Sequence, residues 1–185
     1  MKKTPTGLIT GHYINALRRI HGNENRSKGF GGKVKPLGQF NPLMEEWKPA
    51  TLLDYGCGKG AILSHLSNTY PNTICEGYDP AVNGYQKIRE GTFECVFSID
   101  VLEHIEPTFL NNVLHHIDNL ATRFIWLRID TKSARKKLPN GDNAHLIIED
   151  STWWTQKLNE HIDGKIIYSS VSIKGKFDVA IEKND

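Results

Sequence analysis

The chain has 185 residues, of which 38% are hydrophobic and 24% charged. That length supplies one hydrophobic core and is too short for two domains of ordinary size. No stretch of about 18 consecutive apolar residues occurs, so no segment is expected to cross a bilayer. No continuous apolar run follows the first residues, so no secretory signal is expected. Three irregularly spaced cysteines match no metal box and indicate reduced thiols in a cytoplasmic protein.

The charge is nearly balanced, with 23 basic and 21 acidic side chains. This balance argues against a general nucleic-acid binder, whose affinity depends on many Lys and Arg contacts to phosphate. Basic residues nevertheless gather in two segments, residues 18–36 and 132–137. Either these segments are ordinary solvated surface, or both lie at one opening and attract an anionic small-molecule substrate.

Residues 1–49 are expected to form an N-terminal unit of helix and loop. Apolar residues recur at helical spacing in residues 8–20, which predicts an amphipathic helix. The stretch at 22–38, rich in Gly, Lys and Asn, predicts a loop, and residues 37–47 predict a second helix. Tyr13 and the loop Gly29-Phe30-Gly31-Gly32 are candidates for a lid, with an ordinary flexible loop as the alternative.

From residue 50 to residue 185, strands and helices alternate. The predicted strands are residues 50–55, 73–79, 94–100 and 123–130, and the predicted helices are 61–68, one beginning at Pro80, 107–121 and 150–161. Such alternation indicates a parallel sheet covered on both faces. Residues 165–173 and 176–183 are β-rich and are joined by Lys174-Gly175, which predicts an antiparallel hairpin. We therefore expect an α/β fold whose mostly parallel sheet ends in a C-terminal antiparallel hairpin.

A glycine-rich turn, Asp54-Tyr55-Gly56-Cys57-Gly58-Lys59-Gly60, follows the first strand of this unit and opens a helix. Glycine lets the backbone approach a ligand closely, and N–H groups at the start of a helix can bind a carboxylate or phosphate. Alone, this pattern also fits an ordinary strand–helix turn. Asp79 ends the next strand, 19 residues after Gly60, near the spacing at which a carboxylate reaches a ribose. The same residue could cap a helix.

Three segments, in order, carry a resemblance to a known family. Residues 52–60 resemble the first motif of class I S-adenosylmethionine-dependent methyltransferases, and Gly77-Tyr78-Asp79-Pro80 resembles their acidic second motif. Ser98-Ile99-Asp100-Val101-Leu102-Glu103-His104-Ile105 resembles their fourth motif. The size is similar to that of small methyltransferases encoded in phage and bacterial genomes. The resemblance implies a Rossmann-like methyltransferase domain at residues 50–185, with S-adenosylmethionine as its cofactor.

The resemblance also implies roles for single residues. Carried over by position, the cofactor-binding residues are Asp54, Gly56, Gly58, Gly60, Asp79 and Asp100. The glycines would lie under the methionine part of the cofactor, the first acid near its amino group, the second at the ribose and the third facing the reactive methyl. Only 14 residues lie between Asp79 and Glu94, too few for the family's usual helix and third strand. A shortened or missing edge strand is therefore expected, and the adenine contacts stay open.

The implied reaction is methyl transfer to an oxygen or nitrogen atom, expected on a small molecule because so short a chain has little surface for reading a polymer. A base is needed where the acceptor loses a proton. His145, in the long loop 131–149, and His104, after the fourth-motif strand, are the catalytic candidates, and each could instead be structural. No metal site is expected, although Glu103 and His104 stay open as ligands.

Other functions compete with this interpretation. A non-catalytic module acting through a partner would bind S-adenosylmethionine without transferring its methyl group. An NAD-type oxidoreductase usually has Gly-x-Gly-x-x-Gly, whereas this turn reads Gly-x-Gly-x-Gly. A DNA or protein target stays open, although neither an Asn-Pro-Pro-Tyr or Asp-Pro-Pro-Tyr tetrapeptide nor a Pro-Cys pair follows the fourth-motif strand.

Overall fold

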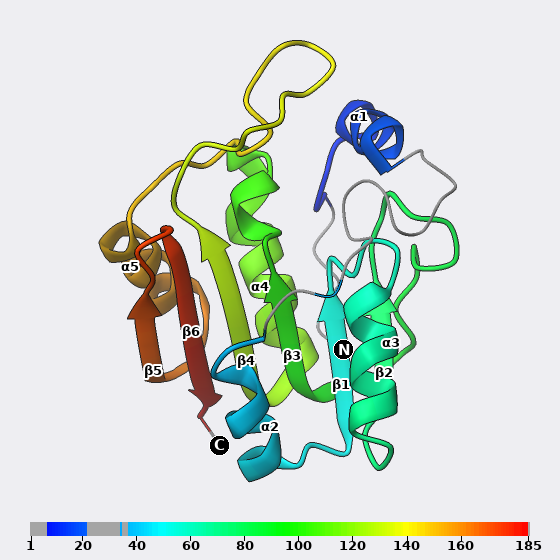
Figure 1. Cartoon of the computed structure of the whole chain (residues 1–185), viewed down its shortest axis with the longest axis vertical. Helices are drawn as coiled ribbons and strands as arrows, with labels where there is room; N and C mark the ends of the chain where they lie inside the picture. The colour runs from blue at the N-terminus through cyan, green and yellow to red at the C-terminus, as the bar shows by residue number, and fades with distance from the viewer. Residues whose placement is uncertain (1–6, 22–33, 35–36, 185) are drawn as a thin grey trace.

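The computed structural model describes residues 7–21, 34 and 37–184. In this part of the chain, helices cover both faces of a six-stranded sheet (Figure 1). The strands are β1 (Thr51–Tyr55), β2 (Ile74–Tyr78), β3 (Phe93–Ile99), β4 (Ala121–Asp130), β5 (Gly164–Val171) and β6 (Lys176–Lys183). The helices are α1 (Gly11–His21), α2 (Phe40–Trp47), α3 (Ala61–Thr69), α4 (Leu110–Leu120) and α5 (Ser151–His161), with short 3₁₀ helices η1 (Leu102–His104) and η2 (Pro107–Phe109).

The strands lie in the order β2-β1-β3-β4-β6-β5. The pairs β1–β2, β1–β3 and β3–β4 are parallel, whereas β6 runs antiparallel to both of its neighbours, β4 and β5. The predicted Rossmann-like α/β fold, with a mostly parallel sheet and a C-terminal antiparallel hairpin, is therefore confirmed. Within the described residues β2 forms one edge of the sheet, with no third strand outside it. This agrees with the short connection between Asp79 and Glu94.

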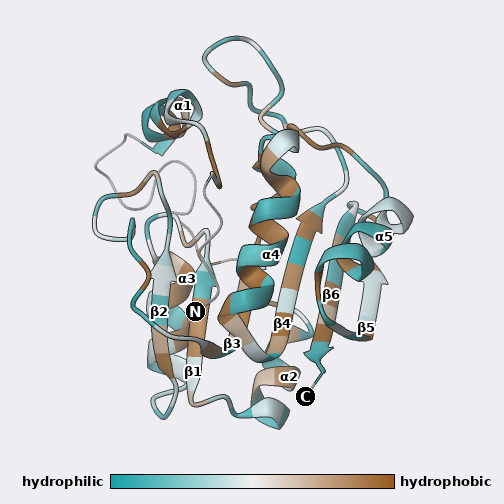
Figure 2. Ribbon diagram, turned by 180° about the vertical axis from the view of Figure 1, so that it is seen from behind, coloured by the Kyte–Doolittle hydropathy of each residue, from teal (hydrophilic) through white to brown (hydrophobic). Residues whose placement is uncertain are grey.

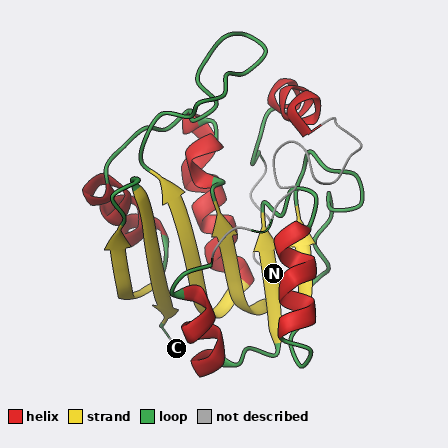
Figure 3. Cartoon of the chain, in the orientation of Figure 1, coloured by secondary structure: helices red, strands yellow, loops and turns green. Residues whose placement is uncertain are grey.

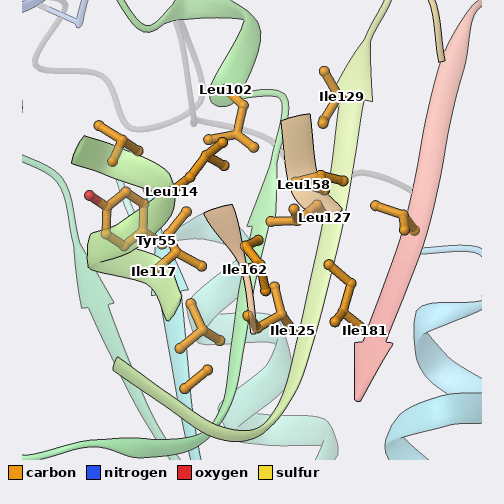
Figure 4. Packing of buried hydrophobic residues seen from close by; sticks show 14 of the residues in the cluster. Tyr55, Leu102, Leu114, Ile117, Ile125, Leu127, Ile129, Leu158, Ile162 and Ile181 are labelled. Atoms are coloured by element: carbon orange, nitrogen blue, oxygen red, sulfur yellow. The ribbon is translucent and has the colours of Figure 1, made fainter. Parts of the chain in front are cut away.

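Two layers of apolar side chains hold the helices to the sheet. Successive residues of a strand point to opposite faces, and β4 divides its side chains in this way. Ile125 and Leu127 pack with α4 and α5, while Trp126 packs in the layer under α2 and α3. Figure 2 shows α4 and α5 on the side of the sheet opposite to α2 and α3. Figure 4 shows the first layer, where Leu114 of α4 and Leu158 of α5 lie among the strand side chains.

The two N-terminal helices have different places in the fold. In α2, Phe40 stacks on Phe97 of β3 with ring centroids 5.1 Å apart, and Trp47 stacks on Phe124 of β4 at 4.3 Å. This helix therefore shares the core of the sheet. In contrast, α1 lies beyond the carboxyl ends of the strands (Figure 3). The boundary predicted at residue 50 stays a prediction. Among the described helices, none has the length and apolar character needed to cross a membrane.

The predicted helix beginning at Pro80 is wrong, because residues 80–92 form turns and irregular structure instead. The carboxylate of Asp79 accepts a hydrogen bond from the Ala81 N–H at 2.9 Å, and the Asp79 N–H donates to the Tyr85 carbonyl at 2.8 Å. Gly84 then takes a φ of 92°, outside the helical region. These local bonds offer the backbone an alternative to a helix. The other predicted helices and strands are present, with their ends shifted by a few residues.

The turn between β1 and α3 leaves no room for a Cβ at two of its glycines, Gly56 and Gly60. Gly56 and Gly60 have φ values of 84° and 74°, a region that residues with a Cβ rarely adopt. A Cβ on Gly56 would overlap the side chain of Val101, and one on Gly60 would overlap the hydroxyl of Tyr85. The Gly56 N–H donates to the carbonyl of Tyr78 at 2.7 Å. The turn is therefore bound to the end of β2 and packed against the segment that follows β3.

This packing yields a prediction for Gly56→Ala, compared with Gly84→Ala. Both glycines have similar positive φ values, but a Cβ on Gly84 meets no atom within 4 Å. Gly84→Ala should therefore lower the free energy of unfolding by the backbone strain alone, about 1–2 kcal/mol. Gly56→Ala should lower it by about 1–3 kcal/mol more, the cost of forcing an extra methyl group against Val101. Urea unfolding measures both values, and equal losses would contradict the close approach to Val101.

Candidate functional site

A cavity opens at the carboxyl ends of three neighbouring strands. Tyr55, Tyr78 and Ile99, the last residues of β1, β2 and β3, all line it. In the sheet, β2 lies on one side of β1 and β3 lies on the other, so the order of strands reverses direction at β1. Open α/β sheets bind ligands at such a point. The further lining residues are Leu8, Ile9, Tyr13, Leu17, His21, Asp54, Gly56, Cys57, Gly58, Ile62, Asp79, Pro80, Asp100, Val101, His104, Ile105, Glu106 and Val113. A largely apolar wall with a few polar groups is typical of a small-molecule site.

Asp79 both holds the glycine-rich turn and faces the cavity. Its side chain is 7% exposed, and its Oδ2 accepts a hydrogen bond from the Gly58 N–H at 3.0 Å. Its Oδ1 accepts the bond from Ala81 described above. Each carboxylate oxygen can accept more than one hydrogen bond, so both oxygens can also accept ligand hydroxyl groups. The carboxylate therefore closes a turn rather than capping a helix. The same geometry leaves it able to accept ribose hydroxyls, as predicted.

The charged groups on the cavity wall are acidic. Asp54, Asp79, Asp100 and Glu106 line the cavity, and among the described residues neither Lys nor Arg does. Carboxylates that surround a site of low dielectric attract a cation and repel a phosphate. S-adenosylmethionine carries a positively charged sulfur, so these residues fit it. The pyrophosphate of a dinucleotide is repelled by the same wall, which argues against the NAD alternative.

Asp100 stands directly after β3 in a left-handed backbone conformation, with φ of 54°. Few residues with a Cβ adopt this region, and they do so where the surroundings hold them in place. Its Oδ1 accepts a hydrogen bond from Lys176 Nζ at 3.0 Å, and the same ammonium donates to Asp130 Oδ2 at 2.7 Å. Burial opposes the charge of Lys176, yet its bonds to Asp130 and Asp100 raise its pKa above the ordinary value. The β6 lysine thus holds the ends of β3 and β4 together.

Two polar contacts set the position of α1 over the cavity. Thr10 donates from its N–H and its hydroxyl to the carboxylate of Glu106, at 2.8 and 2.9 Å. The Tyr13 hydroxyl donates to the carbonyl of His104 at 2.7 Å. Tyr13 is a predicted lid residue, whereas the Thr10–Glu106 pair belongs to no motif and has no signal in the sequence. The other lid candidate, Gly29-Phe30-Gly31-Gly32, lies outside the described residues.

The two histidines predicted as catalytic lie against each other. Their ring centroids are 4.8 Å apart and the rings meet edge to face. His104 lines the cavity, whereas His145 is not among the lining residues and is 8% exposed. His104 Nδ1 bonds to the carbonyl of Ala144 at 2.6 Å, and His145 Nδ1 bonds to the carbonyl of Lys132. Because a carbonyl can only accept, each neutral ring carries its proton on Nδ1 and its lone pair on Nε2.

Glu103 completes this group. Its side chain is fully buried, and one carboxylate oxygen of Glu103 and one ring nitrogen each of His104 and His145 lie within 4.8 Å of one another. Its Oε1 accepts a hydrogen bond from the Asp130 N–H at 3.2 Å. Burial, and then the nearby charge of Asp100, raise the pKa of Glu103 to about 8. No metal site is expected from the sequence, yet the fold brings together three residue types that ligate metals.

The two basic segments come close to each other where the structure describes them. Leu17 of α1 packs with Leu138 and Ala144 of the loop 131–149 in a small apolar cluster. The exposed basic residues on these two elements are Arg18, Arg19, Lys132, Arg135, Lys136 and Lys137. Since Tyr13 and Leu17 of α1 line the cavity, the basic surface and the cavity share this helix. The remaining members of the first segment lie outside the described residues.

Comparisons with known proteins agree with the fold and the site. A family model for a methyltransferase domain matches residues 33–163, more than half of the chain. No curated protein is similar enough in sequence to count as a match.

Several solved structures share the fold. One is 1,6-didemethyltoxoflavin-N1-methyltransferase of Burkholderia thailandensis, with bound 1,6-didemethyltoxoflavin and S-adenosylhomocysteine (TM-score 0.66, 15% identity, 98% of this chain and 93% of that chain). Another is magnesium protoporphyrin IX methyltransferase of Synechocystis PCC 6803 with bound S-adenosylmethionine (TM-score 0.54, 16% identity, 94% and 92%). An O-methyltransferase family protein from Burkholderia thailandensis has a TM-score of 0.58 at 13% identity over 78% of this chain. This chain spans only 56% of the length of that protein.

The family match covers the glycine-rich turn, Asp79, Asp100 and the histidine pair, and the acidic cavity suits the cationic cofactor of the family. The chain therefore belongs to the methyltransferase-domain family and is an S-adenosylmethionine-dependent methyltransferase.

Proposed function

We propose that the protein methylates an oxygen or nitrogen atom of a small molecule that carries negative charge. The observation that carries this proposal is the cavity under α1, which runs from the glycine-rich turn to His104. When bound, S-adenosylmethionine supplies a methyl group on a sulfonium, and a lone pair of the acceptor forms the new bond as the carbon–sulfur bond breaks to leave S-adenosylhomocysteine. A hydroxyl or ammonium acceptor also releases one proton.

The cofactor end of the cavity is assigned to the turn and its acids. Gly56 and Gly58 line the cavity, and their positive φ values favour glycine, so the backbone can approach the methionine part. Gly60 does not line the cavity, but it shares this backbone region and has no room for a Cβ beside Tyr85. Asp54 is 3% exposed and lines the cavity beneath this turn, where its charge favours an ammonium group. Asp79 accepts the ribose hydroxyls, and its bonds to Gly58 and Ala81 hold it ready to do so.

The acceptor end is assigned to His104 and Asp100. Both residues line the cavity, and His145 packs against His104 from the loop 131–149. The Nε2 lone pair of His104 is proposed to promote loss of the acceptor's proton, and His145, which does not line the cavity, supports the His104 ring. Tyr13 supports this arrangement by binding the main chain of His104, so α1 positions the same residue that faces the acceptor.

The preference for an anionic acceptor rests on the basic surface beside the opening. Carboxylates inside the cavity favour the cationic cofactor, whereas exposed Arg and Lys side chains on α1 and the loop 131–149 attract anions from solution. An acceptor of moderate size can therefore keep its charged group at the rim while its reactive atom enters. Two of the structural neighbours are named for methylation of 1,6-didemethyltoxoflavin and of magnesium protoporphyrin IX, which supports a small-molecule acceptor.

Asp79→Ala should weaken binding of S-adenosylhomocysteine by about 1–3 kcal/mol, because ligand hydroxyls lose a buried acceptor. Isothermal titration calorimetry gives the dissociation constant. Since Asp79 also holds the turn, Asp150→Ala is the matched control. Asp150 accepts the Trp153 N–H at 2.9 Å as the N-cap of α5, away from the cavity. That variant should lose about 1 kcal/mol of folding stability and keep full affinity. Unchanged affinity in Asp79→Ala would remove this acid from the cofactor site.

Transfer of a labelled methyl group separates the enzyme from a binding module. The protein and labelled S-adenosylmethionine are incubated with fractionated cell extract, and labelled products are identified by mass spectrometry. We expect label in a small, acidic metabolite fraction. Binding without transfer to any fraction would instead favour the non-catalytic module. Label confined to protein or nucleic acid would overturn the proposed acceptor class while leaving the methyltransferase activity intact.

Charge reversal tests the anionic acceptor once it is known. The double change Arg135→Glu and Lys137→Glu should raise KM several-fold at low salt with little change in kcat, and the effect should shrink as added salt screens the charges. Lys165→Glu, an exposed basic position at the start of β5, is the matched control and should leave KM unchanged. Identical KM values for all three proteins would show that the basic surface does not recruit the acceptor.

A further inference from the structure

We infer that Glu103, His104 and His145 bind a divalent transition-metal ion beside the cavity, and that the methyl acceptor reaches this ion through an oxygen atom. The second part rests on the proposed function, whereas the metal site stands on the geometry of the three side chains. The acceptor is then narrowed to molecules with a hydroxyl or phenol that can ligate a metal.

The first argument is the donor set. Two imidazole nitrogens and one carboxylate oxygen lie within 4.8 Å of one another. Ligands bonded at about 2.1 Å to one tetrahedral ion lie about 3.4 Å apart, so shifts of about 1 Å bring all three into contact with an ion. Three protein ligands leave a coordination position open, as in catalytic rather than structural zinc sites. Two imidazoles among three ligands favour Zn²⁺, Fe²⁺ or Mn²⁺ over Mg²⁺, which prefers oxygen.

The second argument is the support behind each histidine. In metal sites a ligating histidine usually donates its other ring N–H to a carbonyl or carboxylate, which fixes the ring and the tautomer. Here His104 donates from Nδ1 to Ala144, and His145 donates from Nδ1 to Lys132. Both rings therefore present the lone pair of Nε2. The Asn143 side chain also accepts the His145 N–H at 2.9 Å, which holds the main chain of this loop residue.

The third argument is the carboxylate. Glu103 Oε2 is buried and has no hydrogen-bond partner among the described residues, although its other oxygen accepts the Asp130 N–H. A buried polar atom without a partner is costly. A bound cation would supply the contact that this oxygen lacks.

The fourth argument is the local charge balance. Asp100 and Asp130 lie beside Glu103, and the ammonium group of Lys176 contacts both of these aspartates. A divalent ion would neutralise the excess negative charge. Because His104 lines the cavity, the ion would border the space proposed for the acceptor. There it would lower the pKa of a bound hydroxyl, which replaces direct proton transfer to a histidine because the Nε2 lone pairs then bind the ion. The oxygen then bonds to the methyl carbon as the carbon–sulfur bond breaks, and the proton passes to solvent.

Metal binding is measured on the whole chain after dialysis against a chelator. Titration with Zn²⁺ and Mn²⁺, followed by calorimetry and elemental analysis, should show one ion per chain, and either ion should raise Tm. His145→Ala and Glu103→Gln should each weaken binding roughly 100-fold. His115→Ala is the matched control, because His115 and His161 form a second edge-to-face pair, 4.9 Å apart, that lacks a buried carboxylate. This control should bind the ion as the wild-type protein does.

Three readouts keep the outcomes separate. Circular dichroism and the affinity for S-adenosylhomocysteine establish that each variant is folded. In wild-type protein labelled with ¹⁵N-histidine, Zn²⁺ should shift the Nε2 signals of two of the eight histidines and leave their Nδ1 protons in place. This spectrum decides the question even if a variant fails to fold. The metal site would be overturned if the wild-type protein bound less than one ion per chain, or if His145→Ala and Glu103→Gln both bound the ion as tightly as the wild type. Loss of S-adenosylhomocysteine binding by metal-free wild-type protein at every concentration would instead count against the proposed function.

Discussion

The cofactor end of the site depends on the turn from Gly56 to Gly60, whose backbone has to run where no side chain fits. Val101 occupies the place of a Cβ on Gly56, and Tyr85 occupies that of a Cβ on Gly60. The Asp79 carboxylate and the Tyr78 carbonyl accept the N–H groups of the turn. The ends of β1, β2 and β3 are thereby joined at one point. Gly56, Cys57 and Gly58 of this turn line the cavity.

The electrostatic character of the cavity follows from which residues end the strands. Asp79 and Asp100 come directly after β2 and β3, and Asp54 lies near the end of β1, so three carboxylates converge at one edge of the sheet. Parallel strands make this convergence unavoidable, since their carboxyl ends all meet there. The result is a field suited to a cation. The exposed basic side chains described above belong to α1 and the loop 131–149. Negative charge therefore lines the cavity, and positive charge lies on the surface outside it.

Residues close together in the sequence made much of this site predictable. The strands, the glycine-rich turn and the acids that follow them are local patterns, because a strand end and a turn are decided by a few neighbouring residues. The helix expected at Pro80 fails for a local reason too. The bond from the Ala81 N–H to Asp79 would also suit a helix N-cap, but the Asp79 N–H bonds to the Tyr85 carbonyl and Gly84 has a positive φ, so the chain turns back instead. A carboxylate before proline is compatible with a helix and with a turn. The hydrogen bond between the Asp79 N–H and the Tyr85 carbonyl belongs to the turn.

Other parts of the site depend on contacts between distant segments and had no signal in the sequence. Thr10 and Glu106 are 96 residues apart, and no motif connects them. Likewise, His145 belongs to a loop whose course is set by bonds from Leu146 and Ile147 to the carbonyl of Glu103. Those two bonds bring His145 to the histidine that follows β3. The same main-chain contact therefore determines whether His104 and His145 act as one group, which explains why their individual positions in the sequence suggested two separate candidates for a base.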